Sequence, residues 1–241
     1  MCVKRKVAFS HYFYFEINPE ICYNKTMVIT YHGGECFKVQ VGDTVLVFNP
    51  PAKQSPLIVN GKTPRFGADI VLVSLNDEDF NGVQNMTYGD KTPFVVSGPG
   101  EYEIKNIFIK GIASTTRYKE VDRINTAYLV LIDGVNLCFL GAFGSTEAAG
   151  DIDGAFGEVD VLFVPIGGGD VLTSAQAGKV LVGLGPKFVV PMHYLENVKE
   201  SSLDEFLKEE RGEEMKPVAK LTLKKRDLEG KEGEIIVFSQ V

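Results

Sequence analysis

The sequence predicts an α/β protein in which two packed β-sheets carry helices on their outer faces. Many short apolar or alternating segments, which are typical of strands, fill the first half of the chain. Strands alternate with helical segments in the second half, and this order favours two layered sheets with helices outside. The chain has 241 residues, of which 44% are hydrophobic, and it can therefore bury the core that such a sandwich needs.

The first 26 residues differ from the rest of the chain. They are rich in aromatic residues and show no clear period. Basic residues near the start suggest a signal peptide, but polar residues from Glu16 to Glu20 interrupt any apolar region, and no cleavage site follows. A regular alternating pattern begins only at Met27. We therefore expect residues 1–26 to be an extension of doubtful status and residues 27–241 to form one domain.

The first half of this domain is expected to consist of strands and tight turns. Met27–Tyr31 alternates as a strand does, and two further strands at 36–41 and 44–48 flank the turn Gly42-Asp43. A run of β-branched and apolar residues at 70–74 predicts a buried strand that ends in an acidic loop. The remaining strands expected in this region are 94–97, 100–104, 107–112, 126–132 and 136–140.

The second half of the domain contains two helices with recognisable starts. Thr173 and Gln176 form a capping box before a helix that Gly185-Pro186 ends. A second helix is capped at Ser202 and extends to about residue 210. Buried strands at 159–164 and 187–191 flank the first helix, and closing strands are expected at 218–223 and 234–238.

Charge and cysteine usage exclude several classes of protein. The formal net charge is −7, whereas binding to nucleic acid or to an anionic membrane requires basic patches. No apolar run approaches the roughly 18 residues of a membrane span. None of the four cysteines forms a Cys-x-x-Cys pair, so a zinc ribbon or a redox motif is not expected. A reducing, cytoplasmic location is the expectation that follows.

Several segments carry a combined pattern that is more specific than any one of them. They include the opening strand with Gly-Gly-Glu-Cys-Phe, the strand Ala-Asp-Ile-Val-Leu-Val-Ser, and Gly-Pro-Gly-Glu-Tyr-Glu; the matching ranges are 27–37, 68–74, 98–103, 137–141, 158–168 and 186–194. Together they resemble the metallo-β-lactamase superfamily, in particular its bacterial zinc-dependent hydrolases related to ascorbate-6-phosphate lactonase. The resemblance implies an αββα sandwich of two mixed sheets with its site at the strand ends between them. It also implies that a homo-oligomer is common.

The metal-ligand positions of that family are mostly changed in this chain. The family signature His-x-His-x-Asp-His falls on Leu75, Asp77, Asp79 and Phe80, of which only Asp79 is kept. The histidine of the opening strand falls on Gly34, and the bridging aspartate falls on Ala142. A mid-chain histidine would follow Gly111, where 113–116 has none. The last ligand position retains its histidine, His193.

These departures leave three functional hypotheses open, the third of which is an interaction module in which Leu75 and Phe80 fill the cleft and the outer surface binds a partner. Catalytic zinc needs roughly three protein ligands, and leucine and phenylalanine supply none. The first hypothesis is therefore a non-hydrolytic binding or regulatory protein with no metal cofactor and with a small-molecule ligand in the cleft between the sheets. The second is a hydrolase of a small phosphorylated or lactone-like substrate, with a single divalent metal ion held by Asp77, Asp79 and His193. Whether the chain is an enzyme depends on this choice.

Each candidate site residue also has a simpler interpretation. Asp77 and Asp79 could bind a hard cation, or they could lie in a solvated turn. His193 could be a metal ligand, a general base or a structural histidine. Gly167, Gly168 and Gly169 precede a helix start, where an anion could bind, but a tight turn explains them equally well.

Overall fold

The computed structural model describes residues 8–9, 13–14, 25–58, 62–144, 146, 154, 157–194, 201–210 and 215–241. The N-terminal segment 1–26 lies mostly outside these ranges. Within it, β1 (Ala8–Phe9) pairs antiparallel with β2 (Phe13–Tyr14), and this two-stranded ribbon is separate from the two large sheets.

The first large sheet has six strands in the order β14-β3-β4-β5-β6-β7. Its members are β3 (Met27–Tyr31), β4 (Phe37–Val41), β5 (Thr44–Phe48), β6 (Ile70–Leu72), β7 (Phe94–Val96) and β14 (Leu221–Leu223). Pairs from β14 to β5 are antiparallel, whereas β5, β6 and β7 run parallel. The all-apolar β6 is buried along its whole length, as expected for a central strand in a parallel arrangement.

The second large sheet has seven strands in the order β15-β13-β12-β11-β10-β9-β8. Its members are β8 (Gly100–Ile104), β9 (Ile107–Tyr118), β10 (Val121–Ile132), β11 (Val135–Phe139), β12 (Val161–Pro165), β13 (Phe188–Met192) and β15 (Glu234–Ile235). Strands β8 to β11 are antiparallel, and β11, β12, β13 and β15 are parallel. Both sheets are therefore mixed.

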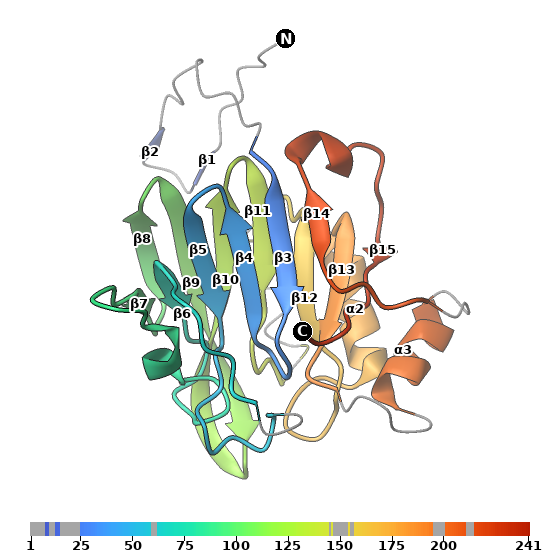
Figure 1. The fold of residues 1–241 in the computed structure, drawn as a ribbon. Coiled ribbons are helices and arrows are strands. Elements are labelled where there is room, and N and C mark those ends of the chain that lie inside the picture. The colour runs from blue at the N-terminus through green and yellow to red at the C-terminus, as the bar shows by residue number, and fades with distance from the viewer. Residues whose placement is uncertain are drawn as a thin grey trace.

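The main core lies between the two sheets. Phe48 of β5 stacks on Phe139 of β11 with ring centroids 4.4 Å apart, and it also contacts Phe163 of β12 at 5.7 Å. Two α-helices, α2 (Ser174–Leu184) and α3 (Ser202–Glu210), pack on the outer face of the seven-stranded sheet (Figure 1). The short 3₁₀-helix η2 (Val83–Met86) packs on the outer face of the other sheet. The predicted α/β sandwich of two mixed sheets is confirmed.

The hairpin of β9 and β10 is longer than the sequence analysis predicts. Strands were expected at 107–112 and 126–132, but each of the two strands has 12 residues, and they remain paired up to Tyr118 and Val121. The sequence analysis assigns no strand to 113–125, where the inward side chains of β9 carry hydroxyl groups. Ser114, Thr116 and Tyr118 are nonetheless buried, in alternation with exposed neighbours. The extension projects past the neighbouring strands at the lower edge of Figure 1.

This extension reaches the loops that follow the parallel strands. Those loops come after β6, β12 and β13 and contain Asp79, Gly167 and His193, respectively. Loops at such strand ends are common places for binding or catalysis. Among the described helices, none combines the length and the hydropathy that a membrane crossing requires.

Candidate functional site

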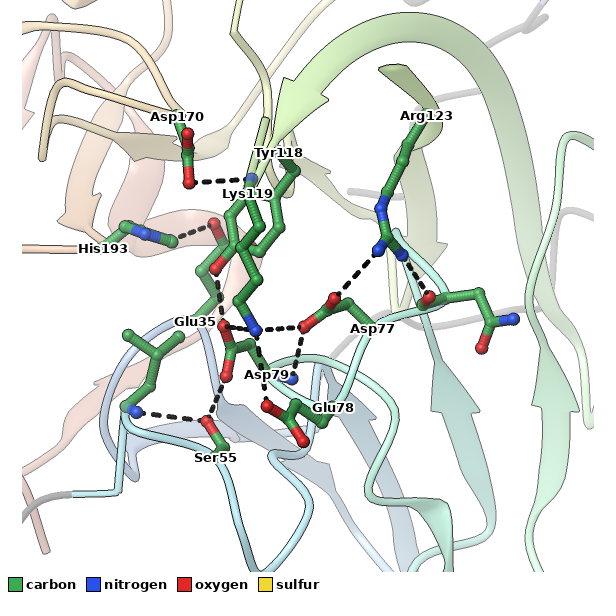
Figure 2. A network of polar contacts seen from close by, with 12 residues as sticks. Glu35, Ser55, Asp77, Glu78, Asp79, Tyr118, Lys119, Arg123, Asp170 and His193 are labelled. Atoms are coloured by element: carbon green, nitrogen blue, oxygen red, sulfur yellow. Dashed lines mark hydrogen bonds and ion pairs between the residues drawn. The ribbon is translucent and has the colours of Figure 1, made fainter. Parts of the chain in front are cut away.

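The loop after β6 directs three consecutive carboxylates at one ammonium group (Figure 2). Nζ of Lys119 lies 2.8 Å from Oδ1 of Asp77 and 2.9 Å from Oδ2 of Asp79. Oε1 of Glu78 is farther away, at 3.6 Å. Nη2 of Arg123 lies 3.5 Å from Oδ2 of Asp77, and Nη1 of the same side chain donates to the carbonyl of Asn76. The cluster therefore places two positive side chains against three negative ones.

Asp79 is the most deeply buried member of this cluster. Its side chain is 1% exposed, and both of its carboxylate oxygens are occupied. The hydroxyl of Tyr118 donates to Oδ2 at 2.8 Å, and the hydroxyl of Ser55 donates to Oδ1 at 2.5 Å. Burial alone would raise the pKa of Asp79, but the hydrogen bonds from Ser55, Lys119 and Tyr118 outweigh burial and lower it. Asp79 is therefore a charged group with a full set of partners.

The same carboxylates also shift the pKa values of Tyr118 and Lys119. Burial and the hydrogen bond to Asp79 raise the pKa of Tyr118, so its phenol stays protonated as a donor. Burial opposes the charge of Lys119, but its bonds to Asp77 and Asp79 raise its pKa above the usual value. Lys119 is consequently an ammonium ion at neutral pH and cannot act as a nucleophile or base.

His193 is held by a buried glutamate. Nδ1 of His193 lies 2.8 Å from Oε1 of Glu35, whose side chain is completely buried. The side-chain amide of Asn49 donates to the other oxygen of Glu35 at 2.7 Å and to the hydroxyl of Ser74 at 2.8 Å. His193 itself adopts a φ of 56°. A carboxylate in this position fixes the orientation of the imidazole ring.

Three residues at positions where the resemblance expects metal ligands form an apolar cluster beside these charges. Leu75, Phe80 and Ala142 are buried and pack together with Tyr118 and Val171. The ring of Phe80 lies 5.1 Å from that of Tyr118, centroid to centroid, and 6.1 Å from that of His193. At the fourth position, Gly34, an added Cβ would lie 3.1 Å from the side chain of Leu57. The space around His193 is thus lined by carbon on several sides.

The glycines after β12 form a tight turn. The N–H of Gly168 donates to the carbonyl of Leu172, and both Gly168 and Gly169 adopt a positive φ. A Cβ added at Gly167 would lie 2.0 Å from the carbonyl oxygen of His193, so this residue permits a close approach of two loops. The helix start that follows is capped by Thr173 and Gln176, as the sequence predicts.

The structure brings some of the predicted residues together and adds others. Asp77 and Asp79 share one cation, Lys119, and their side chains are 8% and 1% exposed. Oδ1 of Asp77 also accepts a hydrogen bond from the N–H of Asp79, which is the local contact that the turn interpretation expects. His193 lies beside this group across two aromatic rings, with centroid distances of 6.2 Å to Tyr118 and 6.1 Å to Phe80. Sequence reasoning missed Tyr118 and Lys119. The alternation of Ser114, Thr116 and Tyr118 was the signal that could have extended the strand to them.

A polar depression adjoins the acidic loop. Its volume is about 440 Å³. The lining consists mainly of amide, carboxylate and guanidinium side chains: Ala52, Gln54, Asn76, Asp77, Glu78, Asn81, Gln84 and Arg123. Such a surface can form hydrogen bonds with a small polar molecule.

Comparison with known proteins assigns the chain to a family. The family model described as a beta-lactamase superfamily domain matches residues 28–193, which is more than half of the chain. The chain belongs to the metallo-β-lactamase superfamily.

Three similar proteins are described as hydrolases. A UPF0173 metal-dependent hydrolase from Thermococcus kodakarensis is 36% identical over 70 residues, which cover 28% of this chain and 30% of that relative. A protein from Thermotoga maritima, described as a candidate zinc-dependent hydrolase of this superfamily, has a crystal structure that is similar with a TM-score of 0.66. The two chains are 25% identical, and the match covers 88% of this chain and 98% of that one. The metallo hydrolase Igni18 from Ignicoccus hospitalis is 19% identical with a TM-score of 0.58, with 82% and 98% covered, and shows the shared fold.

Proposed function

We propose that this chain is a member of the superfamily with a degenerate metal site, and that it acts as a non-hydrolytic binding or regulatory protein. One observation carries the proposal. The residues at three ligand positions, Leu75, Phe80 and Ala142, are packed against each other in a buried apolar cluster. Leucine, phenylalanine and alanine side chains have no lone pair to donate to a metal ion.

A dinuclear zinc centre does not fit the residues that surround this position. Two metals about 3.5–4 Å apart need a bridging ligand, and Ala142 cannot supply one. Asp77 and Asp79 retain carboxylates, but the ammonium of Lys119 already lies within 2.9 Å of both. A divalent cation in contact with the same oxygens would be repelled by that ammonium. The metal-activated water of the family's hydrolytic mechanism therefore has no support from these side chains.

A small-molecule ligand is the partner that the proposal requires. The depression of about 440 Å³ beside Asp77 is large enough for one and lies next to the family's site. Its polar lining favours a hydrophilic ligand over an apolar one. A homo-oligomeric state and a cytoplasmic location stay predictions from the sequence.

A second function is favoured by the descriptions of the relatives. The Thermococcus kodakarensis and Thermotoga maritima proteins are described as metal-dependent and zinc-dependent hydrolases. On this alternative, Asp77, Asp79 and His193 would hold a single divalent metal ion for the hydrolysis of a small phosphorylated or lactone-like substrate. The contacts of Asp79 with Lys119 and of His193 with Glu35 weigh against it, because both side chains are already engaged.

Metal content separates the two functions. Purified protein, incubated with a slight excess of Zn²⁺ or Mn²⁺ and desalted, is assayed by inductively coupled plasma spectrometry and by thermal unfolding with and without EDTA. The proposal expects well below one metal ion per chain and the same Tm in both conditions. Stoichiometric metal together with a lower Tm in EDTA would instead support the hydrolase, and His193→Ala should then abolish both effects.

A further inference from the structure

Two consecutive residues at the tip of the β9–β10 hairpin enter the family's site. Tyr118 packs with Leu75, Phe80 and Ala142, which are the apolar replacements of metal ligands. Lys119 lies between the carboxylates of Asp77 and Asp79 on the other side (Figure 2). The tip therefore fills the apolar half and the acidic half of the site at once.

The backbone of this tip adopts an unfavourable conformation. Lys119 and Glu120 have φ values of 50° and 62°, although turns of this kind prefer glycine or asparagine. Such a conformation persists only when surrounding contacts hold it in place. The contacts are present here, because the N–H of Lys119 donates to Oδ2 of Asp170 at 3.0 Å and the hydroxyl of Tyr118 donates to Asp79. The tip is thus held by Asp170 of the loop after β12 and by Asp79 of the loop after β6.

The charges require a cation at this place. Asp77 and Asp79 have side chains that are 8% and 1% exposed, and Glu78 lies between them in the sequence. Buried carboxylates that lie so near each other destabilise a fold unless a positive charge compensates their negative charge. Of the two buried carboxylates, Arg123 forms an ion pair with that of Asp77, with a nitrogen–oxygen distance of 3.5 Å. Lys119 is the cation that contacts both buried carboxylates.

We propose that the tip of the β9–β10 hairpin is an internal plug of the former metal site, in which the Lys119 ammonium supplies the positive charge that a metal ion supplies elsewhere in the superfamily. Tyr118 completes the plug by covering the apolar half. This inference rests on the proposed loss of the metal centre. It adds that the acidic loop at 76–81 is held in place by the chain itself and needs no external cation.

Removal of the ammonium tests the plug. Lys119→Met keeps the aliphatic stem, and we expect it to lower Tm by roughly 5 °C or more, because it leaves the buried carboxylate of Asp79 without a cation. Arg117→Met is the matched control. Arg117 lies two residues earlier on β9, and its ion pair with Asp122 is exposed, so its Tm should stay within about 1–2 °C of that of the wild type.

Two further measurements show whether charge is the cause. Adding Asp79→Asn to Lys119→Met should restore part of the lost Tm, because the neutral amide no longer needs a cation and can still bind the Ser55 and Tyr118 hydroxyls. Millimolar Mn²⁺ should raise the Tm of Lys119→Met more than that of the wild type or the double variant. If the single variant does not fold, the double variant should still do so.

Several results would overturn the inference. They are a Lys119→Met protein that melts like the Arg117→Met control, a double variant no more stable than the single one, and equal responses of wild type and Lys119→Met to Mn²⁺. These failures differ from a failure of the proposed function. Stoichiometric metal in the wild type contradicts the loss of the metal centre, whereas a metal-free wild type with an unaffected Lys119→Met variant contradicts only the plug.

Discussion

His32 is a residue whose charge is decided by its surroundings. Its ring lies 4.8 Å from that of Phe66, centroid to centroid, and its Nε2 is 3.2 Å from the hydroxyl of Thr30. Burial and the nearby charge of Lys38 lower the pKa of His32 from 6.5 to about 4, against a smaller opposing effect of a backbone hydrogen bond at Val241. His32 is therefore neutral in the folded protein at neutral pH.

This lowered pKa predicts a loss of stability in mild acid. The unfolded chain binds a proton at His32 below pH 6.5, whereas the folded chain does so only near pH 4. The folded state should therefore lose stability as the pH falls between these values, by at most about 1.4 kcal/mol per pH unit from this residue. Urea unfolding followed at several pH values should show this slope in the wild type and a flatter one in His32→Gln. Identical slopes in the two proteins would contradict the assignment.

Glycine has different roles in helix α2 and in the loop before it. Thr173 and Gln176 cap the helix start, and Gly185 ends it in a left-handed conformation with a φ of 52°. Gly183 lies within the helix, and a Cβ added there would have no atom within 4 Å. Gly167, in contrast, faces the carbonyl oxygen of His193.

Alanine substitutions at these two glycines should change stability in opposite directions. Gly183→Ala should raise the free energy of unfolding by about 0.5–1 kcal/mol, because alanine loses less backbone entropy in a helix. Gly167→Ala should lower it by about 1–3 kcal/mol, because the added methyl group forces the His193 loop to move. Urea denaturation of the two variants provides the comparison. A Gly167→Ala variant with the same free energy of unfolding as the wild type would mean that the loops do not approach each other as the structure shows.

At the scale of the whole molecule, aromatic rings join the two sheets into one core. Phe48 comes from the six-stranded sheet, and its neighbours Phe139 and Phe163 come from the seven-stranded sheet. All three are fully buried. Contacts of this kind couple the unfolding of one sheet to that of the other.

Truncation of the central ring should destabilise the whole domain. We expect Phe48→Ala to lower the free energy of unfolding by about 3–5 kcal/mol, because it removes a large side chain from between the sheets. Far-ultraviolet circular dichroism and tyrosine fluorescence should report the same shifted midpoint. Phe94→Ala on the edge strand β7 is the control, since Phe94 is 52% exposed and its loss should cost less than about 0.5 kcal/mol. Two separate transitions would show that the sheets unfold independently.

Most of the elements could be predicted because their patterns depend on neighbours in the sequence. The buried run at 70–72, the hairpin around Gly42-Asp43 and the capping box at Thr173 all appear in the structure. The extension of the β9–β10 hairpin carries a weaker pattern, the alternation of Ser114, Thr116 and Tyr118. Its inward residues are polar, and its turn at Lys119-Glu120 contains neither glycine nor asparagine.

The sequence by itself determined the two-sheet architecture, because it follows from residue type and spacing, and it has Leu75, Phe80 and Ala142 where the resemblance expects metal ligands. Only the tertiary structure decided which partners occupy the site. Asp79 meets Lys119 across 40 positions of sequence and His193 meets Glu35 across 158, and no local pattern records such pairs. They form because strand pairing and sheet packing bring distant loops to one end of the sandwich, where buried charges require partners.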